Sequence, residues 1–413
     1  MEMIFKNNIF NEFLKKTRKK YKLTIPDLSF NTNLSTGTIS NLENNEIMDF
    51  QSEKLKKILT SYHLDTDYLY ALNVSIKDLL DNFINNIIYI NDEDVDKYYL
   101  LLTNNLNQYE DTDFYLLYYF VKLLYFVYTD QINLITKDVL EYILTNKEIL
   151  GNDYLTLCNL YLAQYYYDIH DFENTKTYYN IIKKSIIYNH IDYNDMINYC
   201  LARYSIGLNN HTDAYKYLDL SLTGFAKHSN FNRLINTNIL LANHSLKLHN
   251  YKECIEINLN NLNLIDKNSH LYEQNEILFN IGYTYTFLND FQSTLYYYDQ
   301  IRLNEFNEKK YCHYMLALFE NNHLEQAHAL CDYLTNKVTN PYYIQLVKSF
   351  SNYFINNDYN KLTRSLALIP KKCNLSLYQQ DFLLNILIIH YKKLNQYKKA
   401  FICMEKRFYL STN

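Results

Sequence analysis

The side chains best placed to do chemistry in this chain are hydrogen-bonding ones, and they recur at two spacings. Thr36, Ser40 and Asn41 share one face of a predicted helix, where each can donate and accept a hydrogen bond. Further along, candidate binding residues recur at intervals of 39, 40 and 40 residues, at Gln164, Arg203, Asn243 and Tyr283. Both sets suit recognition of a polar ligand rather than covalent catalysis.

The sequence lacks the common signatures of enzymes. It contains no G-x-x-x-x-G-K-[ST], G-x-G-x-x-G, H-E-x-x-H or G-x-S-x-G motif, and five glycines are too few for a phosphate-binding loop. The histidines are dispersed, and His323 and His328 lack partners at the spacing of metal ligands. We therefore expect no catalytic activity, no metal site and no cofactor.

Composition predicts an all-α fold. Five glycines and three prolines offer few residues for the turns of a β-protein, whereas 45 tyrosines and 22 phenylalanines supply aromatic surface to bury between helices. Seven scattered cysteines without a C-x-x-C pair are expected to be free thiols in a reducing cytosol. Because the chain shows no signal peptide and no long apolar run, we expect a soluble, cytoplasmic protein.

Residues 23–45 carry the local signals of two short helices joined by a turn. Thr24 is a predicted N-cap, and Asp27, three residues on, completes a capping box. Pro26 falls in the first turn, where its missing N–H has no helical partner to lose. Asn33 occupies a turn position that needs a left-handed backbone, which Asn tolerates better than most residues.

This segment resembles the helix-turn-helix of phage repressors, without a gap across both helices. Ser35 is expected to cap the second helix, and Ile39 and Leu42 to face inward. The resemblance implies that the second helix lies in the major groove of DNA. The expected base contacts are Thr36, Gly37, Ser40 and Asn41, and the expected phosphate contacts are Thr24, Thr38 and Asn44.

The resemblance also implies that Arg18 pairs with Glu43 and braces the first helix against the recognition helix. Base recognition is expected to be modest, because the recognition helix has no Arg or Lys and Ile25 replaces a Gln that often touches DNA. Gly37 within this helix costs about 1 kcal/mol of helix propensity. Dimer spacing and DNA shape should therefore contribute more.

Charge is distributed unevenly along the chain. Residues 1–62 hold ten Lys or Arg against seven Asp or Glu, a net charge of +3, and the rest carries 30 against 38, a net charge of −8. A basic end on an acidic body is expected where one end meets phosphate. Lys15, Lys16 and Lys19 are predicted to add electrostatic attraction to DNA.

The helix-turn-helix domain is expected to continue into a fourth helix within residues 52–70 and then a fifth. The residues that the fourth helix should turn inward are Leu55, Ile58 and Leu59. We place a DNA-binding domain at residues 1–68 and a repeat domain at 69–413, without a Gly/Ser/Pro linker.

The rest of the chain contains a repeated helical hairpin. In four clear copies, a turn residue comes nine positions after one small residue and three before another, in the sets Ala163/Phe172/Thr175, Ala202/His211/Ala214, Ala242/Tyr251/Cys254 and Gly282/Phe291/Thr294. Looser copies follow at Leu324, Tyr359 and Tyr397, and two weaker pairs are expected in residues 75–150, which makes roughly nine pairs. The pattern is typical of tetratricopeptide (TPR) repeats, although the period exceeds their usual length of about 34 residues.

A repressor-like helix-turn-helix followed by a degenerate TPR array resembles the RRNPP family of peptide-pheromone receptors (the Rgg, PlcR, NprR and PrgX group). Arbitrium-type phage regulators are a variant of this organisation. The resemblance implies an N-terminal DNA-binding domain followed by a right-handed TPR-like α-solenoid. It further implies a cytoplasmic quorum-sensing transcription regulator, usually a homodimer, that binds double-stranded DNA and is controlled by a short linear signalling peptide.

The resemblance places the peptide on the concave face of the repeat domain. The repeat domain is also expected to mediate dimerisation. Asn and Gln side chains there can pair with peptide amides and carbonyls, and Arg203 is placed to hold a terminal carboxylate. The acidic body favours a peptide without strong negative charge. The expected contacts are Gln164, Tyr199, Arg203, Asn236, Asn243, Phe279, Asn280 and Tyr283.

One alternative remains open from the sequence. In it the helix-turn-helix is vestigial, and the TPR array is a scaffold that sequesters a protein partner. The intact capping box and the apolar pattern of the first 68 residues favour the DNA-binding interpretation.

Overall fold

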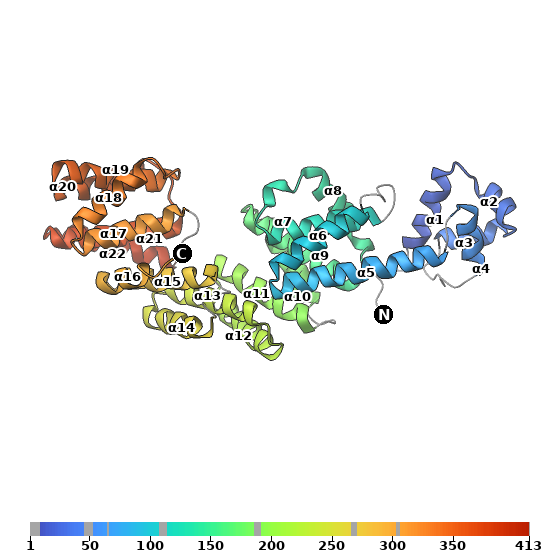
Figure 1. Cartoon of the computed structure of the whole chain (residues 1–413), viewed down its shortest axis with the longest axis horizontal. Coiled ribbons are helices and arrows are strands. Elements are labelled where there is room, and N and C mark those ends of the chain that lie inside the picture. Colours follow the sequence, from blue (N-terminus) through green and yellow to red (C-terminus); the bar gives the residue numbers. More distant parts are fainter. Residues whose placement is uncertain are drawn as a thin grey trace. The chain divides into compact units, whose positions relative to one another are not determined.

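Every regular element of the described chain is a helix. The computed structural model describes residues 9–44, 53–63, 66–106, 114–185, 191–265, 271–302 and 306–412. Within these ranges the helices follow one another through short turns (Figure 1), so the all-α prediction is confirmed. None of the helices described there is both long and apolar enough to cross a membrane.

Four helices form the N-terminal domain: α1 (Ile9–Lys20), α2 (Ile25–Thr32), α3 (Thr36–Asn44) and α4 (Glu53–Ser61). Their apolar faces enclose one small core, in which no side chain is more than 1% exposed: Leu14, Leu28, Ile39, Leu55, Ile58, Leu59 and Tyr62. Leu42 packs against this core from α3. The inward-facing residues predicted for the recognition helix (α3) and for the fourth helix (α4) therefore all contribute to the core.

The turn between α2 and α3 has the predicted geometry. The Thr24 Oγ1 accepts a hydrogen bond from the Asp27 N–H at 3.3 Å, and the Thr24 N–H donates to Asp27 Oδ2 at 2.8 Å. Asn33 ends α2 with a φ of 56°, and Ser35 Oγ accepts from the Thr38 N–H at 3.1 Å. These caps satisfy amides that would otherwise lack partners at both helix starts.

Helix α5 (Thr66–Tyr89) follows the N-terminal domain and packs on α6 (Asp92–Leu106). The domain boundary that we placed at residue 68 falls inside this helix. No loop separates the two parts of the chain at that point.

Helices α5 to α22 form nine consecutive pairs within the described ranges. The remaining members are α7 (Phe114–Tyr128), α8 (Lys137–Asn146), α9 (Asn152–Asp168), α10 (Phe172–Ser185), α11 (Ile191–Gly207), α12 (His211–Lys227), α13 (Phe231–Lys247), α14 (Tyr251–Leu264), α15 (Leu271–Phe287), α16 (Phe291–Tyr298), α17 (Glu308–Glu320), α18 (Leu324–Thr335), α19 (Pro341–Asn356), α20 (Tyr359–Ala367), α21 (Leu377–Lys393) and α22 (Tyr397–Thr412). Short 3-10 turns lie at Ile132–Leu134, Lys147–Ile149 and Ile369–Lys371.

Each predicted turn residue begins the second helix of its pair: Phe172, His211, Tyr251, Phe291, Leu324, Tyr359 and Tyr397. The first helices α9, α11, α13 and α15 each span 17 residues. These long first helices account for a repeat period longer than that of an ordinary TPR.

Small residues allow the paired helices to approach closely. Seven of the eight predicted small positions are 0% exposed: Ala163, Ala202, Ala242, Thr175, Ala214, Cys254 and Thr294. The eighth is Gly282, where an added Cβ would lie 2.5 Å from Cε1 of Tyr298. Helix α15 can therefore pack on α16 at this distance only with glycine at position 282.

A left-handed residue lies two positions before each second helix in α9–α22. These residues are His170, Asn209, His249, Asn289, Asn322, Asn357 and Asn395, with φ values from 50° to 63°. Asn and His adopt this conformation more readily than most residues. The recurrent Asn or His is thus a further repeat signal in the sequence, beside the aromatic and small positions.

The chain divides into two compact units. Unit 1 comprises Met1–Ser205 and Thr212–Arg233, and unit 2 comprises Ile206–His211 and Leu234–Asn413. Unit 1 contains the N-terminal domain and the first repeats. Unit 2 contains most of α13 and all the described helices from α14 to α22.

Candidate functional site

The outward face of α3 is a row of small polar side chains. Thr36, Gly37 and Asn41 are exposed and Ser40 is half-buried, whereas Ile39 on the opposite face is fully buried. The four residues expected to meet base edges therefore share the solvent-facing side of one helix. Their hydroxyl and amide groups suit hydrogen bonds to bases in the major groove.

A buried ion pair holds α3 against α1, as predicted. Arg18 Nε donates to Glu43 Oε1 at 2.7 Å, and Arg18 Nη2 donates to Glu43 Oε2 at 2.8 Å. Arg18 Nη1 also donates to the carbonyl of Leu23 at 3.0 Å. The hydrogen bonds to Glu43 raise the pKa of Arg18. Because the pair is bidentate, it fixes the orientation of α3 as well as its distance from α1.

The residues expected to contact phosphate are already engaged in capping contacts. Thr24 bonds with Asp27, and the Thr38 hydroxyl lies 2.9 Å from Ser35 Oγ. Asn44 Nδ2 donates to the Ser40 carbonyl at 2.8 Å. These side chains order the helix ends first, and each keeps only part of its hydrogen-bonding capacity for a phosphate.

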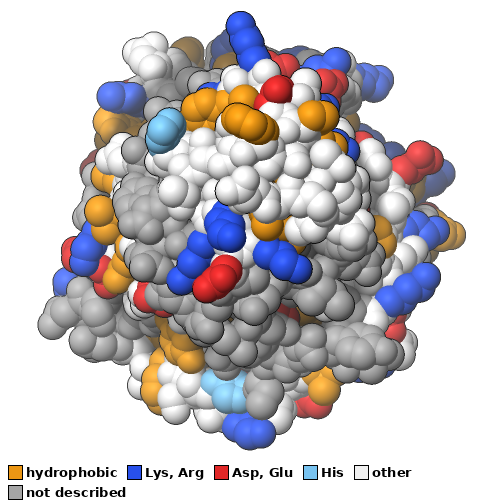
Figure 2. All heavy atoms as spheres, turned by 90° about the vertical axis from the view of Figure 1, so that its right-hand side faces the viewer, with side chains coloured by type: hydrophobic (Ala, Val, Ile, Leu, Met, Phe, Trp, Pro, Cys, Tyr) orange, Lys and Arg blue, Asp and Glu red, His pale blue; other side chains and the backbone are white. Residues whose placement is uncertain are grey.

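The basic residues of α1 differ in accessibility. Lys19 is exposed and Lys15 is half-buried, whereas the side chain of Lys16 lies outside the described residues. Figure 2, which views the molecule from the right-hand side of Figure 1, shows Lys and Arg side chains spread among uncharged polar ones. Lys19 is therefore accessible to a phosphate group, and Lys15 is accessible in part.

In unit 1, the predicted peptide contacts on α9 and α11 meet at one carboxylate. Arg203 Nη2 donates to Asp168 Oδ1 at 2.9 Å, and Gln164 Nε2 donates to Asp168 Oδ2 at 3.1 Å. The Arg203 guanidinium also lies 5.2 Å from the ring centroid of Tyr167. Tyr199, one turn before Arg203, is half-buried. The cation that we expected to hold a peptide carboxylate thus already has an acidic partner.

In unit 2, predicted contacts from two successive repeats line one cavity of about 350 Å³. Asn243 is exposed on α13, whereas Asn280 and Tyr283 on α15 are 7% and 2% exposed. The complete lining is Asn243, Leu246, Lys247, His249, Glu276, Asn280, Tyr283, Lys309, Leu377, Tyr378, Asp381 and Leu410. Its size and its mixture of apolar and polar side chains are those of a small-ligand pocket.

The other two predicted contacts in unit 2 do not line this cavity. Phe279 is 1% exposed, and its ring lies beneath the Lys309 ammonium, 4.7 Å from Nζ to the ring centroid. Asn236, two turns before Asn243 on α13, is half-buried. Phe279 therefore supports the cavity wall from behind.

Five of the twelve lining residues come from elements that the sequence analysis did not connect with the cavity. Lys309 belongs to α17, Leu377, Tyr378 and Asp381 to α21, and Leu410 to α22. The last pair packs back on earlier repeats of unit 2: Asn385 Nδ2 donates to the Thr286 carbonyl at 3.2 Å, and Arg407 Nη2 donates to the Tyr251 hydroxyl at 2.6 Å. Such long-range contacts leave no periodic signal in the sequence.

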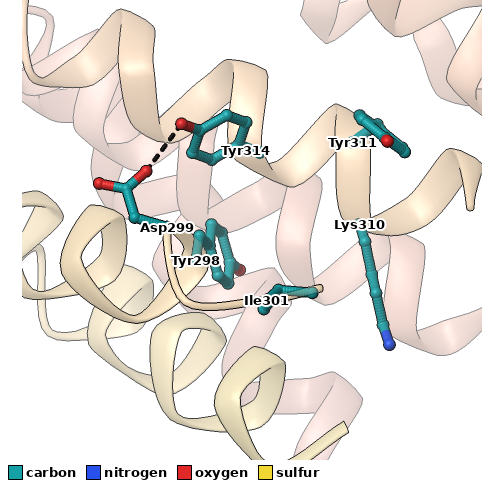
Figure 3. Close-up of a pocket in the computed structure, with 6 residues that line it drawn as sticks. All are labelled: Tyr298, Asp299, Ile301, Lys310, Tyr311 and Tyr314. Atoms are coloured by element: carbon teal, nitrogen blue, oxygen red, sulfur yellow. Dashed lines mark hydrogen bonds between the residues drawn. The ribbon is translucent and has the colours of Figure 1, made fainter. Parts of the chain in front are cut away.

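A second, smaller cavity of about 190 Å³ lies between α16 and α17 (Figure 3). It is lined by Tyr298, Asp299, Ile301, Lys310, Tyr311 and Tyr314. The Tyr314 hydroxyl donates to Asp299 Oδ1 at 2.7 Å, and burial together with this bond raises the pKa of Tyr314 to about 12. Lys310 points away from this pair in Figure 3, and its ammonium forms an ion pair with Glu276 at 2.7 Å, so this cation is already engaged.

Three buried cysteines of the described chain lack the properties of catalytic nucleophiles. Burial raises the pKa of the Cys158 and Cys331 thiols to about 12 and that of Cys200 to about 11, which makes them poor nucleophiles. Within the same ranges, no group of three or more His, Cys, Asp or Glu side chains is arranged to hold a metal ion.

Comparison with known proteins finds a family match for the N-terminal domain and structural matches over most of the chain. The helix-turn-helix domain family matches residues 11–75. The apo form of the quorum sensor NprR from B. thuringiensis is 15% identical, with a TM-score of 0.62 over 81% of this chain and 98% of that one. A Rap protein complexed with competence and sporulation factor is 13% identical, with a TM-score of 0.61 over 82% and 98%.

NprR in complex with its cognate peptide NprX is 15% identical, with a TM-score of 0.56 over 82% of this chain and 99% of that one. No curated protein sequence matches the chain. At these identities the structural matches show a shared fold. Together with the N-terminal match, they confirm the resemblance to the RRNPP regulators: a helix-turn-helix domain followed by a TPR-like helical array.

Proposed function

We propose that the chain is a transcriptional regulator that binds operator DNA through α3 and is controlled by a short signalling peptide bound in its repeat domain. The observation that carries the first half is the exposed polar face of α3, held in place by the buried Arg18–Glu43 pair. The pair fixes α3 with this polar face turned toward solvent, which is the orientation that a recognition helix needs.

The cavity of unit 2 supports the second half of the proposal. Asn243 and Asn280 come from successive repeats and line the same space, so one extended ligand could bond with both. An extended peptide exposes amides and carbonyls that Asn side chains can pair with. One protein of the same fold, NprR, binds a cognate peptide, NprX. We propose the same class of ligand here, in a cytoplasmic quorum-sensing role.

DNA recognition should combine a modest direct readout with symmetry. Helix α3 contains no Arg or Lys, so it lacks the strongest bidentate partner for guanine. Two copies of α3 on a two-fold axis would double the contacts and add the spacing of half-sites as a source of specificity. We therefore propose that the functional species is a homodimer.

The DNA-binding half is tested with the full-length protein and the DNA upstream of its own gene. Replacing Ser40 and Asn41 by Ala should weaken binding by roughly 1–3 kcal/mol, the range for a lost base contact. Thr60→Ala on α4 is the matched control, because Thr60 is also an exposed polar residue of this domain. Affinity should also fall steeply with salt. Binding that is absent at every salt concentration, with and without peptide, contradicts the proposal.

A protein scaffold is the second candidate, because α3 lacks basic residues and a Rap protein shares the fold. In that case the repeat array would sequester a protein partner and the N-terminal domain would not bind DNA. Recovery of one stoichiometric protein partner, from a protein without any genomic footprint, would favour the scaffold over the regulator.

A further inference from the structure

Within the described ranges, three nitrogen donors line the cavity of unit 2 without forming an ion pair with an acidic side chain. Lys247 donates to a backbone carbonyl, that of Ile206, at 2.9 Å, and the Lys309 ammonium lies over the rings of Phe279 and Tyr378, at 4.7 and 4.3 Å from their centroids. Asn280 Nδ2 is buried and has no hydrogen-bond acceptor among the described residues. A buried donor left without an acceptor costs about 1–3 kcal/mol, so this arrangement favours a ligand that supplies acceptors.

The two acidic residues that line the cavity, Glu276 and Asp381, form ion pairs with basic residues outside the lining. Lys310 Nζ lies 2.7 Å from Glu276 Oε1, and Arg407 Nε lies 2.8 Å from Asp381 Oδ1. Neither Lys310 nor Arg407 lines this cavity. After these two pairs are set aside, the charges left to a ligand are the two ammonium groups of Lys247 and Lys309.

Burial affects both ammonium groups in the same direction. Loss of hydration lowers the pKa of Lys247 and of Lys309, and the nearby Glu276 only partly opposes this effect at Lys309. A partly desolvated cation is stabilised most by an anion placed beside it. The cavity is therefore better suited to a bound anion than to a neutral ligand.

We propose that the cavity of unit 2 binds a carboxylate of the peptide, with Lys247 and Lys309 as its cations and Asn280 as an additional donor. The inference rests on the proposed function, that a peptide binds in the repeat domain. An ionised carboxylate only accepts hydrogen bonds, and it has two oxygens for the three donors. The carboxylate is that of the C-terminus or of an Asp or Glu side chain, since both present the same chemistry.

This assignment changes two expectations drawn from the sequence. Arg203, which we expected to hold a terminal carboxylate, is paired with Asp168 at 2.9 Å. The net charge of −8 beyond residue 62 suggested a peptide without strong negative charge, yet the acids lining this cavity are paired and its lysines are not. Local pairing, rather than net charge, determines what the cavity attracts.

The test uses a pool of random hexapeptides, synthesised once as free acids and once as C-terminal amides. Full-length protein is incubated with each pool, and the retained peptides are eluted and sequenced by mass spectrometry. A C-terminal carboxylate as ligand predicts retention from the free-acid pool alone. A side-chain carboxylate predicts retention from both pools, with Asp or Glu enriched at one position.

Three separate variants test the residues: Lys247→Met, Lys309→Met and Asn280→Asp. Each should lower the retention of carboxylate peptides by about tenfold or more, since one hydrogen bond to a charged group is lost or one repulsion gained. Lys252→Met is the matched control, because Lys252 lies on α14 with its side chain 89% exposed. Circular dichroism of each variant checks that the helices remain folded, and the three substitutions lie on three different helices.

Two outcomes would overturn the inference, and they differ in what they say of the proposed function. Peptides retained without any preference for a carboxylate, or retained equally by folded Lys247→Met and Lys309→Met, would remove the anion site and leave peptide binding intact. No retention from either pool would remove both the peptide-binding proposal and the inference.

Discussion

At the scale of single residues, the Arg18–Glu43 pair shows what a buried charge requires. The two side chains are 11% and 2% exposed, and two hydrogen bonds of 2.7 and 2.8 Å join them. A carboxylate so little hydrated is tolerated only beside a cation that bonds with both of its oxygens. The pair therefore holds α3 in place while leaving the outer face of that helix free for a ligand.

Arg18→Met should destabilise the N-terminal domain by about 3–5 kcal/mol, because it leaves the Glu43 carboxylate buried without its partner. Hydrogen exchange of the α1 and α3 amides in the full-length protein measures this loss. Lys19→Met, an exposed neighbour, is the control, and the double change Arg18→Met with Glu43→Met should recover much of the stability. Exchange in Arg18→Met equal to that of the unchanged protein would show that the pair does not stabilise α3.

A second buried acid lies in unit 2, where Glu320 joins α17 to α21. The His390 Nε2 lies 3.0 Å from Glu320 Oε1, and Lys393 Nζ donates to Glu320 Oε2 at 2.6 Å. Burial alone would raise the pKa of Glu320, but the bond with His390 and the charges of His390 and Lys393 outweigh it and lower the pKa below its usual value. The ionised carboxylate is thus the form that the fold stabilises.

A lowered pKa in the folded state gives a definite pH dependence. The stabilisation from Glu320 should be fully present above the pKa of an unfolded Glu, about 4.3, and should be lost as the pH falls through the lower folded value. Denaturant unfolding at a series of pH values should show this acid loss, and Glu320→Gln should reduce its slope. An equal slope in the variant and the unchanged protein would show that other carboxylates cause the acid loss.

At the scale of elements, the repeat pattern predicted where helices begin but not which distant helices meet. Phe172, Tyr251 and Phe291 begin second helices as expected, since each repeat carries its own turn and small-residue signals. The walls of the unit 2 cavity were not predictable in this way. Tyr378 of α21 and Lys309 of α17 line this cavity because repeats that are remote in sequence pack together. The periodic pattern gives no information on such packing.

Two glycines in helices give opposite expectations for the same substitution. In Gly282→Ala the new Cβ would meet Tyr298 Cε1 at 2.5 Å, so α15 and α16 must separate or the ring must move, at a cost of about 1–3 kcal/mol. In Gly37→Ala the nearest atom is Ser35 Oγ at 3.9 Å, so the change should stabilise α3 by about 1 kcal/mol. Hydrogen exchange resolved by helix compares the two, and destabilisation of α3 by Gly37→Ala would contradict this account.

At the scale of the whole molecule, the expected peptide contacts divide between the two compact units. Gln164, Tyr199 and Arg203 belong to unit 1, whereas Asn243 and Asn280 belong to unit 2. Binding in either unit changes DNA affinity only if the peptide prefers one conformation of the chain and that conformation binds DNA differently. Asn243, exposed on the unit 2 cavity, and Lys247, which lines the same cavity, are the residues through which such a preference can be tested.

The central claim is that peptide binding changes the affinity of the protein for DNA. The DNA affinity of the full-length protein, measured with and without peptide, tests this claim most directly. The measurement titrates DNA from upstream of the gene, in the presence of the hexapeptide that the protein selects from the random pool. We predict that saturating peptide shifts the dissociation constant by fivefold or more, the common range of coupling between sites being about 1–3 kcal/mol. The double variant Asn243→Ala with Lys247→Met, which changes two residues that line the unit 2 cavity, should keep the affinity seen without peptide and lose the shift. A dissociation constant unchanged by saturating peptide in the unsubstituted protein would contradict the account.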